Sequence, residues 1–231
     1  MGAYEKTVFC LANSRRPGGT CFAGKEFNGG KASCWIRPIN SFHSGAISVR
    51  DRLYMDQSHA ELLDIVQIPL LNPAPHLHHQ EDHQIDAEQY WEKKGRATWT
   101  DVVNATDVIN GSLWVNEDSS YHGQNDKVSE ASAAKLSGSL YLIEPQDLTL
   151  RVGMESTFKG PAIRRVRATF TYGDFRYNFV VTDEPIEQAY FGRGDGNHKI
   201  TGDVRLSVSL AEVLGGSATK LVAAVITPDR I

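Results

Sequence analysis

The strongest structural signal in the chain is the segment IRRVRATFTYGDFRYNFVVTD, residues 163–183. Polar and apolar residues alternate on both sides of Gly173–Asp174, a dipeptide typical of a tight turn between antiparallel strands. The mainly apolar face holds Val166, Ala168, Phe170 and Tyr172, together with Arg164. We therefore predict a β-hairpin of strands Ile163–Tyr172 and Phe175–Asp183, with its apolar face turned to a core.

Shorter strands are expected on both sides of this hairpin, separated by turns rich in Gly, Asn and Ser. They are Thr7–Ala12, Ser33–Ile39, Leu62–Leu71, Leu140–Ile143, Leu148–Val152, Val204–Leu210 and Lys220–Ile226. Short helices are expected over Ala87–Lys94 after an Asp86 cap, over Asp101–Ala105 after a Thr100 cap, and over Pro185–Phe191. The predicted fold class is mainly β with short helices, a β-rich α+β protein.

The strands form two groups, each on the scale of a small barrel. We expect a first β unit over residues 1–71 and a second over residues 136–231. Residues 72–135 begin with the Pro- and His-rich run NPAPHLHHQEDHQ and are expected to form an acidic, partly helical connection.

The net charge of the chain is −4, but the charged residues are distributed unevenly along it. Residues 1–50 hold seven Lys/Arg against two acidic residues, whereas residues 51–130 hold five against fifteen. Six of the remaining twelve Lys/Arg fall between Arg151 and Arg176. Two basic zones therefore flank an acidic middle, a pattern that favours an anionic partner such as nucleic acid.

Other protein classes find little support in the sequence. The longest apolar run, Leu221–Ile226, is far too short to span a membrane, and the first residues lack the features of a signal peptide. A cytoplasmic location without membrane contact is expected. Three widely spaced cysteines (Cys10, Cys21 and Cys34) argue against a disulfide framework and against a Cys-rich zinc site.

The first basic zone lies in VFCLANSRRPGGTCFAGKEF, residues 8–27, and in CWIRPIN, residues 34–40. A strand is expected to run into a loop that holds Arg15, Arg16 and Lys25, with Trp35 and Arg37 on a following strand. The run GTCFAGK has phosphate-loop spacing, but Glu26 replaces the required Ser or Thr and no helix follows. An NTPase is therefore disfavoured. An anion-binding loop and an ordinary solvated basic loop remain open.

The second basic zone is the 163–183 hairpin. Alternation places Arg165, Arg167, Thr169 and Thr171 on the outward face, where guanidinium groups could contact phosphates. Tyr172 or Phe175 at the turn could stack on a base. The alternative is a polar, solvent-facing sheet that binds nothing.

Four segments together resemble the dual OB-containing domain found in bacterial proteins. They are NSRRPGGTCFAG, WIRPIN, PHLHHQEDHQID followed by Tyr90–Trp91, and VSLAEVLGGSATKLVAAVI. The resemblance implies two OB-like barrels and, by analogy with other OB folds, nucleic-acid binding. It also suggests an accessory role in nucleic-acid processing or in defence against phage.

Our sequence-based hypothesis is a non-catalytic module that binds single-stranded DNA or RNA and needs no cofactor. The proposed contact residues are Arg15, Arg16, Lys25, Trp35, Arg37, Arg164, Arg165, Arg167, Tyr172, Phe175 and Arg176. One alternative is an enzyme acting on a nucleotide or nucleic acid through Cys21, or through a metal held by the cluster His76, His78, His79 and His83. Another is an adaptor that binds a larger protein partner through the acidic middle.

Overall fold

A computed structural model describes residues 3–43, 45–157 and 160–231, and these residues are mainly β-strand, as predicted. The chain divides into two compact units. Unit 1 comprises the residues up to Thr106, together with Ser137–Leu140 and Pro228–Ile231. Unit 2 comprises Asp107–Leu136 and Tyr141–Thr227. The segment 72–135, expected to connect two domains, is thus shared between the units at Thr106.

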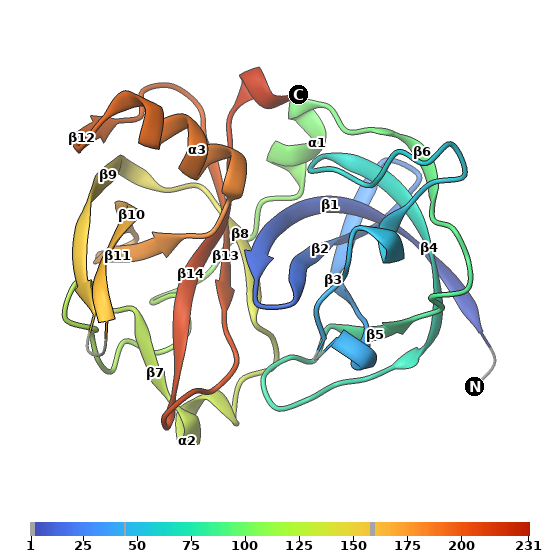
Figure 1. Cartoon of the computed structure of the whole chain (residues 1–231), viewed down its shortest axis with the longest axis horizontal. Helices are drawn as coiled ribbons and strands as arrows, with labels where there is room; N and C mark the ends of the chain where they lie inside the picture. Colours follow the sequence, from blue (N-terminus) through green and yellow to red (C-terminus); the bar gives the residue numbers. More distant parts are fainter. Residues whose placement is uncertain (1–2, 44, 158–159) are drawn as a thin grey trace. The chain divides into compact units, whose positions relative to one another are not determined.

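The strands of unit 1 form a closed barrel (Figure 1). They are β1 (Tyr4–Arg16), β2 (Gly19–Asn28), β3 (Lys31–Ile39), β4 (Asp64–Pro73), β5 (Asp82–Ile85) and β6 (Glu92–Arg96). The sheet order is β1-β2-β3-β5-β4-β6, and β4 also pairs with β1, which closes a ring of five strands. β3 and β5 are parallel, and the other pairs are antiparallel. This is the strand arrangement of an OB barrel, and β6 is an added strand that pairs with the first half of β4.

The prediction of a loop after the first strand is wrong. β1 continues to Arg16, and β2 starts at Gly19 after a tight turn at Pro17–Gly18. Gly18 has a φ of 87°, which allows the turn. Gly24 lies inside β2, where a Cβ would come within 2.0 Å of the Phe9 carbonyl oxygen. A glycine is therefore required at position 24 because two strands approach closely there, and it does not mark a loop.

Two expected helices in unit 1 need correction. Residues 87–94 form a turn that leads into β6, because the Asp86 carboxylate accepts from the Glu88 backbone N–H (3.2 Å) and the backbone then pairs with β4. Helix α1 (Trp99–Asn104) begins two residues earlier than expected, after Thr98. Thr98 and Asp101 form a reciprocal capping box, which satisfies the first free N–H groups of the helix.

Unit 2 forms a second barrel of the same kind. Its elements are β7 (Lys127–Ser129), α2 (Glu130–Ala133), β8 (Leu140–Ile143), β9 (Gln146–Thr157), β10 (Gly160–Tyr172), β11 (Phe175–Val181), α3 (Glu184–Arg193), β12 (Gly196–Lys199), β13 (Arg205–Leu210) and β14 (Ser217–Ile226). The sheet order is β12-β9-β10-β11-β14-β13-β8, and β7 pairs with β14. β11 and β14 are parallel, like β3 and β5 of unit 1.

The break at Glu144–Pro145 explains how the second sheet closes. β8 ends at Ile143 and β9 begins at Gln146, so they are two halves of one bent strand. One half pairs with β13 and the other with β10, which returns the sheet to its starting strand. Proline has no N–H to give to a ladder and suits such a break.

The predicted hairpin is confirmed as β10 and β11, with Tyr172 paired to Phe175 across the turn. Its apolar face packs in a core that also contains Tyr177, Phe179 and Leu150. The predicted third helix is confirmed as α3, which Asp183 caps at its N-terminus. In Figure 1, α3 lies beside β12 at one end of this sheet. The outward face of the sheet is left for polar side chains.

Candidate nucleic-acid interface

The ligand face of an OB barrel is the outer side of its second and third strands, together with neighbouring loops. In unit 1 these strands are β2 and β3, on which Lys25 and Trp35 are register partners. The Lys25 ammonium lies 5.6 Å from the Trp35 ring centroid and donates to the Ala105 carbonyl oxygen at 2.7 Å. Lys25 is only 6% exposed, because the end of α1 covers this part of the strand pair. Its burial argues against a phosphate contact.

Arg37 of β3 is buried by a second covering segment. Its Nε donates to Asp82 Oδ1 at 2.6 Å, and its Nη1 donates to Ser139 Oγ at 3.4 Å. Glu81 lies 4.0 Å from the same guanidinium and hydrogen-bonds to Ser139. Arg37 is 5% exposed and links β3 to β5 and to residues 137–140. It stabilises the barrel, and a nucleic acid could not reach it without displacing these partners.

Arg15 and Arg16 occupy the end of β1 beside the Pro17–Gly18 turn. Arg15 is exposed and Arg16 is half-buried, opposite Thr20 and Gly19 respectively. This turn is the loop between the first and second barrel strands, which borders the ligand face of an OB barrel. It is the part of the first basic zone that stays at the surface.

In unit 2, the equivalent face remains partly open to solvent. Cross-strand neighbours share a face of the sheet, so register identifies the outward side chains of β12, β9, β10 and β11. One row runs from Lys199 through Thr149 and Thr169 to Asn178, and the next from Asn197 through Arg151 to Arg167. The first row borders a hollow of about 410 Å³. The hollow is lined by Asp147, Thr149, Thr169, Phe170, Thr171, Arg176, Asn197 and Lys199.

The open part of this face is cationic. Arg151 and Arg176 are exposed, and within the described residues no carboxylate forms an ion pair with either side chain. Lys199 lies 3.9 Å from Asp147, but both side chains are exposed, so water screens their interaction. Hydroxyl and amide groups between the cations can donate hydrogen bonds to an anion.

The other end of the face is closed by ion pairs. The Arg167 Nε donates to Glu155 Oε1 at 2.5 Å, and its Nη1 lies 3.9 Å from Asp126. Arg165 lies 3.7 Å from the same Glu155. Alternation predicted the outward direction of Arg167, but this guanidinium is buried rather than solvent-facing. Arg164 points to the opposite side, where it pairs with Asp195 at 2.8 Å.

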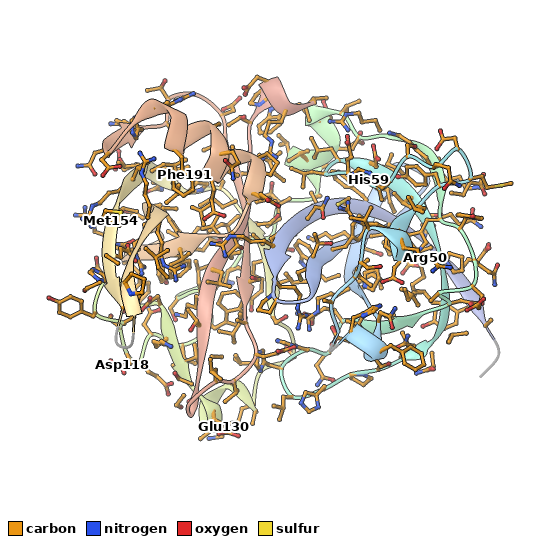
Figure 2. All side chains as sticks on the ribbon, in the orientation of Figure 1. Arg50, His59, Asp118, Glu130, Met154 and Phe191 are labelled. Carbon is orange, nitrogen blue, oxygen red and sulfur yellow. The ribbon has the colours of Figure 1, made fainter. Side chains whose placement is uncertain are left out.

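A segment that runs from Asp118 to Asp126 accounts for this burial. Gln124 exchanges backbone hydrogen bonds with Asn178 of β11, and the Asn125 side chain donates to the Arg176 carbonyl oxygen at 2.9 Å. The segment thereby lies along β11 and brings the Asp126 carboxylate to Arg167. In Figure 2, Asp118 marks where it begins, and Met154 and Phe191 mark other parts of unit 2.

The two stacking residues predicted at the hairpin turn differ in exposure. Phe175 remains partly exposed beside the turn, 36% by area. Tyr172 is half-buried, and its hydroxyl accepts from the Ile109 N–H at 2.9 Å, which fixes the ring against the core. Phe175 is therefore the better placed of the two to meet a base.

The predicted metal and nucleophile candidates do not form a site of either kind among the described residues. No group of three His, Cys, Asp or Glu side chains among the described residues could hold a metal ion. His78 and His79 are buried, His76 is exposed, and His83 hydrogen-bonds to the Tyr4 hydroxyl at 2.5 Å. Burial raises the pKa of the Cys21 thiol, and the nearby Arg37 and Arg16 offset that rise only in part. A reactive thiolate needs the opposite shift.

Sequence reasoning missed the contribution of β9 and β12 to the open face. Leu148, Leu150 and Val152 alternate with Thr149 and Arg151, the same period-two pattern that identified the hairpin. That pattern could have identified Arg151 as outward-facing. Asn197 and Lys199 carry no comparable signal, because β12 has only four residues.

The family model of the dual OB-containing domain matches residues 6–225. The chain therefore belongs to this family, in agreement with the two barrels described above. Neither a curated protein nor a solved structure matches the chain. No helix in the described part of the chain is long and apolar enough to cross a membrane.

Proposed function

We propose that this protein binds single-stranded nucleic acid, without catalysis, through the outer face of β12, β9, β10 and β11. The observation that carries the proposal is the hollow of about 410 Å³ on that face, bordered by exposed Arg176 and Lys199. It lies on the strands that OB barrels use for oligonucleotides. Family membership supports the ligand class only by analogy, so the site chemistry bears the argument.

Each part of the face has a matching part in a single strand. Arg151 and Arg176 would contact phosphates as charged forks, and Lys199 would add a point charge. Thr149 and Thr169 would donate hydroxyl hydrogen bonds to phosphate or sugar oxygens. Phe175 would stack on an unpaired base, which a duplex does not offer. A hollow of this volume suits a small ligand group such as one nucleotide.

The proposal revises the set of contact residues expected from sequence. It leaves out Lys25, Arg37 and Arg167, because all three are buried: Lys25 donates to a backbone carbonyl, and the two arginines pair with carboxylates. It keeps Arg15 and Arg16 as additional contacts at the surface turn of unit 1. Arg165 is half-buried beside Glu155 and would contribute less than Arg151 or Arg176.

Fluorescence anisotropy with a labelled single-stranded oligonucleotide tests this function. Arg176→Ala should weaken binding about fivefold to tenfold, the size expected for the loss of one charge-assisted contact. Arg50→Ala removes an exposed cation from unit 1, which Figure 2 labels, and should leave the affinity unchanged. A wild-type protein that binds no oligonucleotide at low salt, or an equal loss in both variants, would contradict the proposal.

A further inference from the structure

A second hollow, of about 700 Å³, lies in unit 1, and its lining residues come from neither β2 nor β3. Two loops form it, one before β4 and one between β5 and β6. The lining residues are Tyr54, Met55, Asp56, Ser58, Glu88, Gln89, Tyr90, Trp91, Glu92 and Lys93. This composition differs from that of the face in unit 2, because aromatic and acidic side chains dominate.

The walls of this hollow are held by backbone hydrogen bonds. The Tyr54 N–H donates to the Ser58 carbonyl at 2.8 Å, and the Trp91 N–H donates to the Leu53 carbonyl at 3.1 Å. Leu53 also forms a bridge with His59, which Figure 2 labels in this part of unit 1. The two loops are therefore tied to each other, and the hollow is preformed.

Large apolar side chains stand open at this hollow. Met55 is 82% exposed and Tyr90 is 54% exposed. Tyr54 and Trp91 are buried and form the inner lining. The Tyr54 hydroxyl donates to Asp64 Oδ2 at 2.9 Å, and burial followed by the Asp64 charge raises its pKa. Tyr54 therefore stays neutral and adds no charge to the hollow.

The charge at the hollow is negative. Asp56 accepts from the Ser58 hydroxyl at 2.6 Å and from its N–H at 2.9 Å, and these bonds lower the Asp56 pKa and keep the group ionised. Glu88 and Glu92 add two carboxylates, and Glu92 pairs with the Lys94 ammonium at 2.6 Å. The cation of the lining, Lys93, is engaged 2.7 Å from Asp64. A phosphate would be repelled here, whereas a cation would be attracted.

We propose that this hollow binds an arginine side chain presented by a partner protein. The planar guanidinium would lie over the exposed Tyr90 ring and pair with Asp56 and Glu88. The apolar Met55 would cover the aliphatic stem of the arginine. The proposal is independent of nucleic-acid binding, because it uses a different surface of opposite charge. It specifies the chemistry by which the acidic middle of the chain would recognise a protein.

The experiment uses the full chain and a fluorescent peptide in which one arginine is flanked by leucine and glycine. An otherwise identical peptide with citrulline has the same shape but no charge. We expect the arginine peptide to bind about tenfold more tightly than the citrulline peptide at low salt, from the combined loss of a cation–π contact and an ion pair. Equal binding of the two peptides would overturn the proposal.

Variants locate the contact. Tyr90→Ala and Glu88→Gln should each weaken the arginine peptide about fivefold, whereas Glu130→Gln, which removes an exposed carboxylate from unit 2, should not. All three side chains are exposed, so circular dichroism should show folded proteins. Unchanged binding in Tyr90→Ala would overturn the proposal. So would equally tight binding of N-acetylarginine amide, which would assign the hollow to a small guanidinium compound rather than to a protein.

Discussion

The outer faces of the two barrels have the same place in the fold but different surroundings. In unit 1, the carbonyl of Ala105 and the hydroxyl of Ser139 cover β2 and β3, and the cations Lys25 and Arg37 are buried. In unit 2, the corresponding strands keep a hollow with exposed Arg176. A cation on this face is therefore accessible to a ligand only where no other part of the chain covers it.

The largest expected effect concerns a cation on the covered face. Arg37→Ala should destabilise the protein by about 4 kcal/mol, because it leaves Asp82 and Glu81 buried without their cation. Urea denaturation measures this change. The matched variant in the open face, Arg176→Ala, should change the unfolding free energy by less than about 0.5 kcal/mol. Equal stability of the two variants would break the contrast between covered and open faces.

Two glycines, one in each barrel, allow the same comparison of a closely packed and an open site to be made with the backbone. Gly24→Ala in β2 should cost about 3 kcal/mol, because the new Cβ would meet the Phe9 carbonyl oxygen at 2.0 Å. Gly153→Ala in β9 should be close to neutral, since the nearest atom to its Cβ is an Arg151 side-chain nitrogen at 3.9 Å. Thermal unfolding of both variants checks the difference. A tolerated Gly24→Ala would show that β1 and β2 are less closely packed than described.

A third prediction compares two buried cations. Arg37 has carboxylate partners, whereas the Lys220 ammonium donates to the Asn116 amide oxygen at 2.8 Å and lies 5.6 Å from the Tyr177 ring centroid. Burial lowers the pKa of Lys220 to about 8, although Asp126 and Glu117 act against it. The charged form of Lys220 is thus disfavoured in the folded state. Lys220→Met should therefore stabilise the protein at pH 7 by about 2 kcal/mol, a net value that includes the loss of one hydrogen bond.

The pH dependence of Lys220→Met has a definite sign. Because the folded pKa lies below the ordinary value of 10.5, the penalty is complete below about pH 8 and disappears as the pH rises to about 10.5. The advantage of Lys220→Met over the wild type should therefore shrink between pH 7 and pH 10. Denaturant titrations at both pH values measure it. An advantage that is constant or grows with pH would contradict the assigned pKa shift.

Sequence alone predicted much of the framework, because the signals were local. The 163–183 hairpin followed from period-two alternation around Gly173–Asp174, and the inner and outer faces of β10 were assigned correctly. The first basic zone was harder, since Gly18, Gly19 and Gly24 resemble loop residues when their neighbours in space are unknown. Position 24 must be glycine because a Cβ there would meet the carbonyl oxygen of Phe9 on the adjacent strand.

The availability of each cation could not be predicted, because burial depends on distant segments. Lys25 is covered by a residue 80 positions later, and the Ser139 hydroxyl that meets Arg37 is 102 positions later. Arg167 is paired with Glu155 and Asp126, which lie on another strand and on a long irregular segment. No local sequence pattern around these cations indicates that they have such partners. The same residue type is therefore a structural ion pair at one position and a candidate ligand contact at another.

The account is tested most directly by the salt dependence of single-strand binding. We compare the wild type, Arg151→Ala/Arg176→Ala in unit 2 and Arg15→Ala/Arg16→Ala in unit 1, measuring affinity for one labelled oligonucleotide between 0.05 and 0.2 M salt. Loss of two phosphate contacts should reduce the slope of log affinity against log salt by about 1.4 in the unit 2 variant, and by less in the unit 1 variant. An unchanged slope in the unit 2 variant, with a reduced slope in the unit 1 variant, would contradict the assignment of the binding face.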